Sequence, residues 1–280
     1  MTELRRRMIE DMKLHGLSST TQRVYVDAVK VLAEHYHRSP DRLSEDEIRQ
    51  FFTYLTETRR LAPCTIQVYV FAIKFLYQRT LRRPWPVLGL LRVKRPKKLP
   101  VVLSPDEVWH LLDLVRRPVA RMSLILMYSC GLRVSEATHL RVSDIDSRRM
   151  VVCVRGGKGA QDRNVPLPAR TLELLRAYWL KHRSASWLFP SRDPAKPITT
   201  AAVRRCLKAA LSESGIKKRV SCHTLRHSYA THLLEKGVNL RSIQALLGHR
   251  SCRMTFIYMH LTEATMQVVH GAVNGLMAKL

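Results

Sequence analysis

A proline-rich, basic segment limits what this chain can fold into, because it divides the 280 residues into two parts. Pro84 and Pro96 interrupt any helix, since proline lacks the backbone N–H and clashes with the preceding turn. The stretch 94–100 is basic and lacks apolar periodicity, so we interpret it as an extended linker. Residues 1–93 and 101–280 are then two predicted domains, each long enough to bury its own core.

The first part has the apolar periodicity of helices. The segments 20–36, 44–55 and 65–78 each repeat apolar residues at helical spacing. Polar residues that favour a helix start precede the first two. The inward face of the first segment is predicted to consist of Val24, Ala28, Val31, Leu32 and His35.

The second part combines helices with a short hairpin. Residues 104–107 read Ser-Pro-Asp-Glu, which places serine at the N-cap, proline at the first helical position and glutamate at the third. The apolar run 119–130 predicts a central helix that ends at Gly131. Two hairpin strands and two further helices are predicted at 150–154, 163–167, 168–182 and 200–212. The predicted fold class is mainly α with a small β-sheet, an α+β arrangement.

The charge balance indicates a polyanionic partner. The chain has 48 Lys and Arg against 22 Asp and Glu, a formal charge of +26. Small soluble domains usually have a net charge of about 2–8, so nucleic acid is the partner that this excess favours. A membrane surface is the other candidate, but no apolar run approaches the roughly 20 residues of a bilayer span. The basic face of segment 65–78 and the linker either contact phosphates or are simply solvated.

The compartment and the redox state follow from the N-terminus and the cysteines. The first residues mix acids and bases and lack the apolar block of a secretory signal, so we expect a cytoplasmic protein. The six cysteines include no C-x-x-C pair. We therefore expect reduced, structural thiols.

Two arginines are placed to grip the non-bridging oxygens of one phosphodiester. Arg226 follows His223 by three residues at a predicted helix start, where free N–H groups favour anions. Arg133 follows a glycine turn, and Glu136 can hold its guanidinium as an i,i+3 pair. Each guanidinium can make a fork of two bonds to a phosphate, which lysine cannot. For either arginine alone, a surface ion pair is the alternative interpretation.

Two histidines complete the cationic set. His223 and His227 are four residues apart, like a helical zinc pair, but Thr224 stands where the metalloprotease pattern needs glutamate. No metal site is therefore predicted. His249 follows Leu-Leu-Gly, a helix end with a glycine cap, and its side chain is expected to reach outward. As an isolated signal, His249 is also typical of a turn histidine with a local partner.

Tyr258 is the candidate nucleophile and Lys158 the candidate acid. A phenol has a pKa of about 10, so it attacks only when a base takes its proton and cations favour the phenolate. His223 and the two arginines can do both. Lys158 lies between glycines in the predicted hairpin turn and can protonate a departing 5′ oxygen. Taken singly, Tyr258 also fits a helix surface and Lys158 a plain turn.

Together these residues resemble the tyrosine recombinases, the family of phage integrases and Xer-type enzymes. The family order is Arg, Lys, His-x-x-Arg, His, Tyr. This chain fills every position in that order with Arg133, Lys158, His223, Arg226, His249 and Tyr258. The words GLRVSE, GGKG, HTLRHSYATHLLEKG and LGHRS match as well. The resemblance is close over the catalytic domain and looser over residues 1–93, where the family has a helical core-binding domain.

The resemblance implies an enzyme that cuts and rejoins DNA at specific sites. Tyr258 would attack the scissile phosphate and form a 3′-phosphotyrosyl bond, and a 5′ hydroxyl would then attack that bond and reseal the strand. One phosphate ester replaces another, so neither ATP, a metal nor another cofactor is expected. The implied partners are double-stranded DNA and other protomers, in a homotetramer on two synapsed sites, alone or with a paralogue.

The resemblance also assigns a role to each remaining residue. Arg133, Arg226 and His249 would stabilise the transition state. Lys158 would be the general acid, and His223 would assist proton transfer. The two domains would form a clamp around the duplex.

Two features depart from the family or leave its pattern open. Many relatives have threonines on both sides of the tyrosine, whereas Phe256 and Ile257 precede it here and Met259 follows it. A polar contact around this segment is therefore expected to be missing. Residues 269–280 have helical apolar spacing, which fits either the family's tail helix on the next protomer or packing against its own domain.

Two other functions stay open from the sequence. A tyrosine transesterase that mainly relaxes supercoils would use the same residues, and recombination of a two-site plasmid separates it from a recombinase. A basic DNA-binding protein with a vestigial site is the alternative outside enzymes. The element served, whether chromosome, plasmid, phage or transposon, is also left open.

Overall fold

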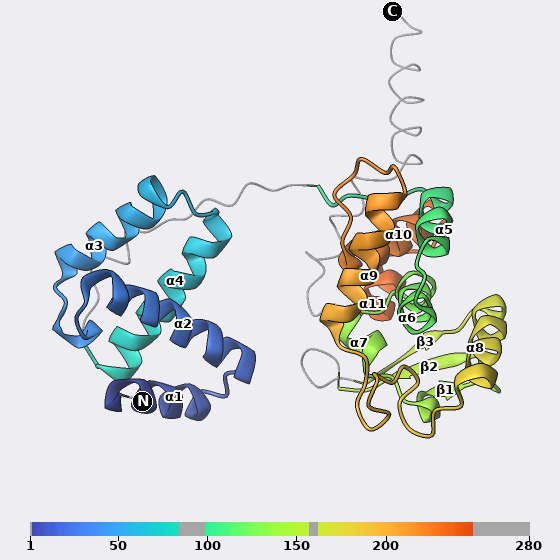
Figure 1. Cartoon of the computed structure of the whole chain (residues 1–280), viewed down its shortest axis with the longest axis horizontal. Coiled ribbons are helices and arrows are strands. Elements are labelled where there is room, and N and C mark those ends of the chain that lie inside the picture. The colour runs from blue at the N-terminus through green and yellow to red at the C-terminus, as the bar shows by residue number, and fades with distance from the viewer. Residues whose placement is uncertain (1, 84–98, 157–161, 249–280) are drawn as a thin grey trace, which may run out of the picture. The chain divides into compact units, whose positions relative to one another are not determined.

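The structure is a computed structural model that describes residues 2–83, 99–156 and 162–248 (Figure 1). The chain forms two compact units, Met1–Lys97 and Lys98–Leu280. Residues 94–98 of the predicted linker lie outside the described residues, and the predicted domain limits stay predictions. None of the helices in the described ranges combines the length and the apolar character that crossing a bilayer demands.

The described part of the first unit is built from helices. They are α1 (Glu3–Leu14), α2 (Ser19–Tyr36), a short 3₁₀ turn (Pro40–Arg42), α3 (Glu45–Thr53) and α4 (Pro63–Phe75), and π-helical turns extend α3 and α4 over Tyr54–Thr58 and Leu76–Thr80. Ser44 and Glu47 form the capping box that starts α3. Leu32, Phe51 and Ile73 are fully buried in the core that these helices share.

The predicted inward face of α2 is confirmed in part. Ala28 and Leu32 are buried as predicted, but Val24 is 39% exposed, His35 is exposed, and Val26, which was not predicted, is buried. Apolar residues lie on more than one face of this helix, so more than one face satisfies the helical spacing. Packing against α4 selects the face that includes Val26.

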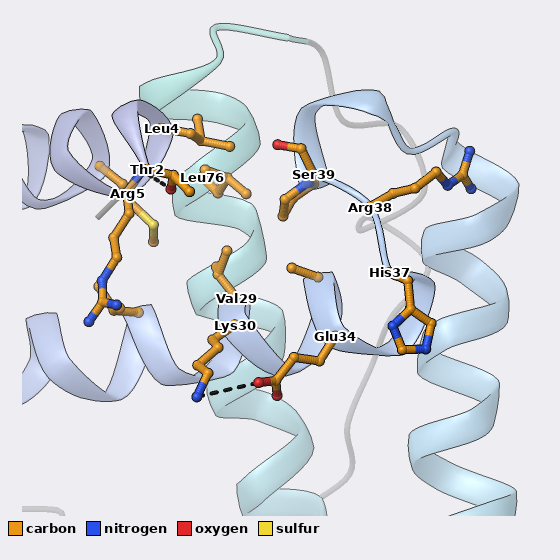
Figure 2. Close-up of a pocket in the computed structure, with 14 residues that line it drawn as sticks. Thr2, Leu4, Arg5, Val29, Lys30, Glu34, His37, Arg38, Ser39 and Leu76 are labelled. Carbon is orange, nitrogen blue, oxygen red and sulfur yellow. Dashed lines mark hydrogen bonds and ion pairs between the residues drawn. The ribbon is translucent and has the colours of Figure 1, made fainter.

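The first unit also has a groove of about 670 Å³ beside α1 (Figure 2). Leu4, Val29 and Leu76 are part of its mostly apolar lining, and Lys30 and Glu34 form an ion pair at 3.3 Å beside them. The volume is in the range of small-ligand pockets. None of the six predicted catalytic residues lines this groove.

The second unit is organised around one buried helix. Its α-helices in the described ranges are α5 (Pro105–Asp113), α6 (Pro118–Ser129), α7 (Val134–Thr138), α8 (Ala169–His182), α9 (Thr200–Glu213), α10 (Cys222–Glu235) and α11 (Leu240–Leu247), and a 3₁₀ turn covers Val142–Asp144. Helix α6 is the predicted apolar helix, and it contacts α5, α7, α8, α9 and α10. Gly131 follows it with a φ of +62°, which allows the sharp turn into α7.

A three-stranded antiparallel sheet completes the second unit. Its strands are β1 (Ile145–Asp146), β2 (Val151–Val154) and β3 (Arg163–Pro166), in the order β1-β2-β3. Val152 pairs with Val165, so the predicted hairpin is confirmed. Asp162 accepts a bond from the Gly156 N–H at 2.8 Å where the two strands lead into the turn. The mainly α fold with a small sheet is the fold class predicted from the sequence.

Candidate active site

The described residues include three of the six predicted catalytic residues. Arg133, His223 and Arg226 belong to the second unit and are described. Lys158, His249 and Tyr258 lie outside the described residues, and their predicted roles stay predictions. The described part of the site consists of Arg133, His223, Arg226 and the residues that contact them.

The chain turns at Gly131 after the buried helix α6, and Arg133 is the N-cap residue of the next helix, α7. Its Nη1 lies 2.7 Å from Glu136 Oε1, and its backbone N–H donates to Glu136 Oε2 at 2.8 Å. The predicted i,i+3 pair is thus confirmed. Because Glu136 holds both the backbone and the guanidinium, the direction of the Arg133 side chain is fixed at its two ends.

Helix α10 brings His223 and Arg226 into its first turns. Arg226 is only 4% exposed and lies between two turns of backbone. Its Nη1 donates to the Gly131 carbonyl at 2.7 Å, its Nη2 donates to the Leu247 carbonyl, and Glu136 Oε2 is 3.7 Å from Nη1. Both arginines of the predicted pair therefore meet at the same carboxylate.

A third arginine, which the sequence interpretation did not single out, closes this cluster. Arg163 of β3 places Nη1 at 3.0 Å from Glu136 Oε1 and Nη2 at 2.8 Å from Glu136 Oε2. Its Nε donates to the Leu246 carbonyl at 2.9 Å. The strand pattern could have indicated that Arg163 faces the protein. Residues two apart in a strand share a face, and Val165, two residues after Arg163, is fully buried.

The C-terminal end of α11 accepts one bond from each arginine. Arg163 bonds the Leu246 carbonyl, Arg226 the Leu247 carbonyl and Arg133, at 3.3 Å, the Gly248 carbonyl. Carbonyls at a helix end lack partners within the helix, and the helix dipole is negative there, so guanidiniums are favourable partners. Gly248 ends α11 in the left-handed conformation, and His249 is the next residue of the chain.

The cluster has a net positive charge. Three guanidiniums surround the single carboxylate of Glu136, which is 5% exposed. Burial by itself would raise the pKa of Glu136, but hydrogen bonds from Arg163 and Arg133 outweigh it and lower the pKa to about 2. Glu136 is therefore charged at every pH of physiological interest, and the charges of the three guanidiniums and this carboxylate sum to +2.

His223 is held in its neutral form. Burial lowers its pKa, and the charges of Arg226, Arg204 and Arg133 lower it further. A neutral imidazole beside a cationic cluster can accept a proton from a nearby hydroxyl. Burial also lowers the pKa of His227, to about 4, with His223 and Arg226 contributing. Among the residues that the structure describes, no cluster of three or more His, Cys, Asp or Glu side chains is placed to hold a metal ion.

Comparisons with known proteins cover both units. Residues 102–265 match the model described as "Phage integrase family", and residues 4–87 match "Phage integrase, N-terminal SAM-like domain". A relative from Sinorhizobium fredii is 44% identical over 262 residues, which is 93% of this chain and 85% of that protein. An integrase/recombinase from Escherichia coli is 32% identical and covers 88% of this chain and 86% of its own length. The tyrosine recombinase XerA of Thermococcus onnurineus is 41% identical over 60% of this chain and 61% of that protein.

Solved structures extend the similarity to the fold. A crystal structure of XerA recombinase is 28% identical, covers 96% of this chain and 97% of its own, and has a TM-score of 0.55. XerH bound to its palindromic difH substrate is 20% identical, covers 93% and 82% of the two chains, and has a TM-score of 0.72. With both units matched by the family's own domain models and with close relatives along most of its length, this chain is a tyrosine recombinase and belongs to the phage integrase family.

Proposed function

We propose that this recombinase cuts and rejoins double-stranded DNA with Tyr258 as the nucleophile. The observation that carries the proposal is the cluster of Arg133 and Arg226 on Glu136. Both arginines also bond the end of α11, at the carbonyls of Leu247 and Gly248, and His249 is the next residue of the chain. The residues 1–93 would be the core-binding domain, 94–100 the linker and 101–280 the catalytic domain.

The charge of the cluster fits a phosphoryl transfer. A phosphodiester has one negative charge, and the pentacoordinate transition state formed by a phenolate concentrates two on the phosphoryl oxygens and the apical groups. The three guanidiniums and Glu136 leave two positive charges. Such a preorganised donor set stabilises the transition state more than the ground state, and the loss of one donor typically costs about 10²–10³ in rate.

The remaining roles in the proposal follow from the protonation states. His223, with its pKa lowered, would take the Tyr258 proton or pass it on. Lys158 would protonate the 5′ oxygen that leaves, and His249 would stabilise the transition state with the arginines. The phosphotyrosyl ester keeps the energy of the broken ester, so a 5′ hydroxyl can reseal the strand with no ATP and no metal.

The partner in the proposal is double-stranded DNA. XerH has been solved with its difH substrate after cleavage, and a lambda integrase fragment as a dimer on a core site. The excess of basic residues in this chain supports the same class of ligand. We also propose that four copies synapse two sites, alone or with a paralogue, and that the protein acts in the cytoplasm.

A trapping experiment tests the proposal. The protein selects a duplex from a random-sequence pool, and that duplex is nicked a few nucleotides downstream of the cleavage position. Cleavage then releases a short fragment with the 5′ hydroxyl, which diffuses away and cannot reseal the strand. The expected result is a covalent protein–DNA adduct with wild type and none with Tyr258→Phe, while both bind the duplex. No adduct with wild type, or equal adducts with both proteins, would contradict the proposal. A plasmid with two copies of the site then tells recombination from simple relaxation.

A further inference from the structure

Arg163 joins three elements that are far apart in the sequence. It lies in β3, is 11% exposed, and bonds Glu136 of α7 and the Leu246 carbonyl of α11. Its two Nη atoms meet both carboxylate oxygens of Glu136, which is the bidentate geometry that only arginine provides.

Glu136 transmits this fork to Arg133. Its Oε1 accepts from Nη1 of Arg133 at 2.7 Å and from Nη1 of Arg163 at 3.0 Å. Its Oε2 accepts from the Arg133 backbone N–H at 2.8 Å and from Nη2 of Arg163 at 2.8 Å. Both oxygens are thus shared between the two arginines. A fork of two parallel bonds fixes the plane of the carboxylate, and that plane sets where Nη1 of Arg133 can lie.

Arg133 and Arg163 contact Glu136 in different ways. The guanidinium of Arg163 closes on Glu136 with both Nη atoms, whereas Arg133 places one Nη on Glu136 and the other on the Gly248 carbonyl at 3.3 Å. The side chain of Arg133 is also more exposed, at 18% against 11%. Arg163 therefore has both Nη atoms on the carboxylate, whereas Arg133 has one Nη atom there and is the more exposed of the two side chains.

Arg163 also contacts the C-terminal end of α11. A Cβ on Gly248 would lie 3.1 Å from Arg163 Cδ, so the glycine is packed against the arginine side chain. With its bond to Leu246, this contact holds the last turn of α11, from which the chain continues directly to His249.

We propose that Arg163 is a positioning residue for DNA cleavage, which orients Arg133 through Glu136 and anchors the α11 end that leads into His249. This inference rests on the proposed function of Arg133 and His249. A displacement of about 1 Å in a catalytic group can cost about 10²-fold in rate, so the residue matters without touching DNA.

The test compares Arg163→Met and Arg163→Lys with Arg170→Met. Arg170 also has a glutamate partner at 2.8 Å, Glu173, but that pair is exposed on α8. The control therefore removes the same charge and the same kind of pair from the same unit. Each full-length protein is assayed on the selected, nicked duplex for binding affinity, for the single-turnover rate of adduct formation at saturating protein, and for its melting temperature.

We expect Arg163→Met to lower the single-turnover rate about 10²-fold with little change in affinity for the duplex. Arg163→Lys should fall nearly as far, since an ammonium cannot form the fork, although it keeps the charge and is the milder change for folding. Arg170→Met should keep the wild-type rate. A wild-type rate in a folded Arg163→Met or Arg163→Lys would overturn the inference.

A pH series separates positioning from packing. The charged groups that face Glu136 among the described residues are Arg133, Arg163 and Arg226. Removing Arg163 takes away a leading interaction that keeps Glu136 charged, so its pKa should rise in both variants. Glu136 should then become protonated in the variants as the pH is lowered toward its ordinary value of 4.5, and the rate ratio of variant to wild type should fall. The titration of His223 is common to both proteins and cancels in this ratio. A ratio independent of pH would show that Arg163 only packs.

The outcomes distinguish this inference from the function on which it rests. If wild type forms no adduct, the proposed function fails. If wild type forms the adduct, Tyr258→Phe does not, and both Arg163 variants react normally, the function stands and the positioning role is refuted.

Discussion

The ring of Tyr229 lies against Gly131 so closely that a Cβ on Gly131 would come within 2.5 Å of Tyr229 Cε1. The same glycine has a φ of +62°, and its carbonyl accepts the 2.7 Å bond from Arg226 Nη1. One position thus combines a backbone that favours glycine, a close approach of a ring from α10 and a hydrogen bond to a predicted catalytic arginine. The turn after α6 therefore fixes where both Arg133 and Arg226 stand.

Gly131→Ala should destabilise the protein by about 2–5 kcal/mol, the sum of a left-handed backbone penalty and overpacking. Gly215→Ala is the matched control, because its φ is +70° but no atom lies within 4 Å of the new Cβ. The control should lose only about 1–2 kcal/mol. Urea unfolding of both variants measures the free energies of unfolding. Equal losses would show that the contact with Tyr229 is not a constraint.

Glu136→Gln should remove stability that depends on pH. The pKa of Glu136 is about 2 in the folded protein, against an ordinary value of 4.5, so its contribution is complete above about 4.5 and is lost as the pH falls toward 2. At neutral pH the difference corresponds to about 3 kcal/mol in the free energy of unfolding. The gap between wild type and the variant should narrow as the pH is lowered through this window.

Unfolding by urea at a series of pH values measures that gap. Glu173→Gln is the control, because Glu173 makes an equally short pair with Arg170 on the exposed face of α8. Surface pairs contribute little, so the control should show almost no gap. A constant gap for Glu136→Gln across the series would mean that the carboxylate is not held charged by the arginines.

His223→Gln should change the shape of the pH profile of cleavage. Burial and the nearby arginines lower the pKa of His223, so the imidazole is neutral at pH 7 and becomes protonated only below the ordinary value of 6.5. If the neutral form accepts the phenol proton, the wild-type rate is level near neutrality and falls at acid pH. The variant should be slower by about 10²–10⁴-fold and should lack that acid fall.

Single-turnover adduct formation between mildly acid and neutral pH gives this profile. Burial lowers the pKa of the neighbouring His227 to about 4, so its own titration contributes little to a fall that begins just below the ordinary imidazole value of 6.5. An acid fall that persists unchanged in His223→Gln would assign the proton transfer to another group.

The sequence predicted what is decided locally. The start of α5 was predicted from Ser104 and Glu107, and the capping box is present because both partners lie within one turn. The predicted inward face of α2 was right for Ala28 and Leu32 but wrong for Val24, since apolar residues on several of its faces leave the exact rotation to packing against α4. Arg163 was missed because its partners Glu136 and Leu246 are 27 and 83 residues away in the chain. A capping box can be predicted from sequence because its two residues are neighbours in the chain. The ion cluster on Glu136 cannot, because its arginines come from three separate elements.

Ser228→Ala should cost about 1–3 kcal/mol in the free energy of unfolding, because it leaves a buried donor without an acceptor. Ser228 of α10 is fully buried, bonds the Thr224 carbonyl at 3.0 Å and accepts the Leu103 N–H at 3.0 Å. Ser123 of α6 is an internal control, since it is equally buried and bonds the Val119 carbonyl at 2.8 Å, but the structure gives it no backbone donor within the described residues. Ser123→Ala should therefore be close to neutral. If urea unfolding finds the same loss for both serines, the bond from Leu103 does not tie the start of the second unit to the helix that carries Arg226.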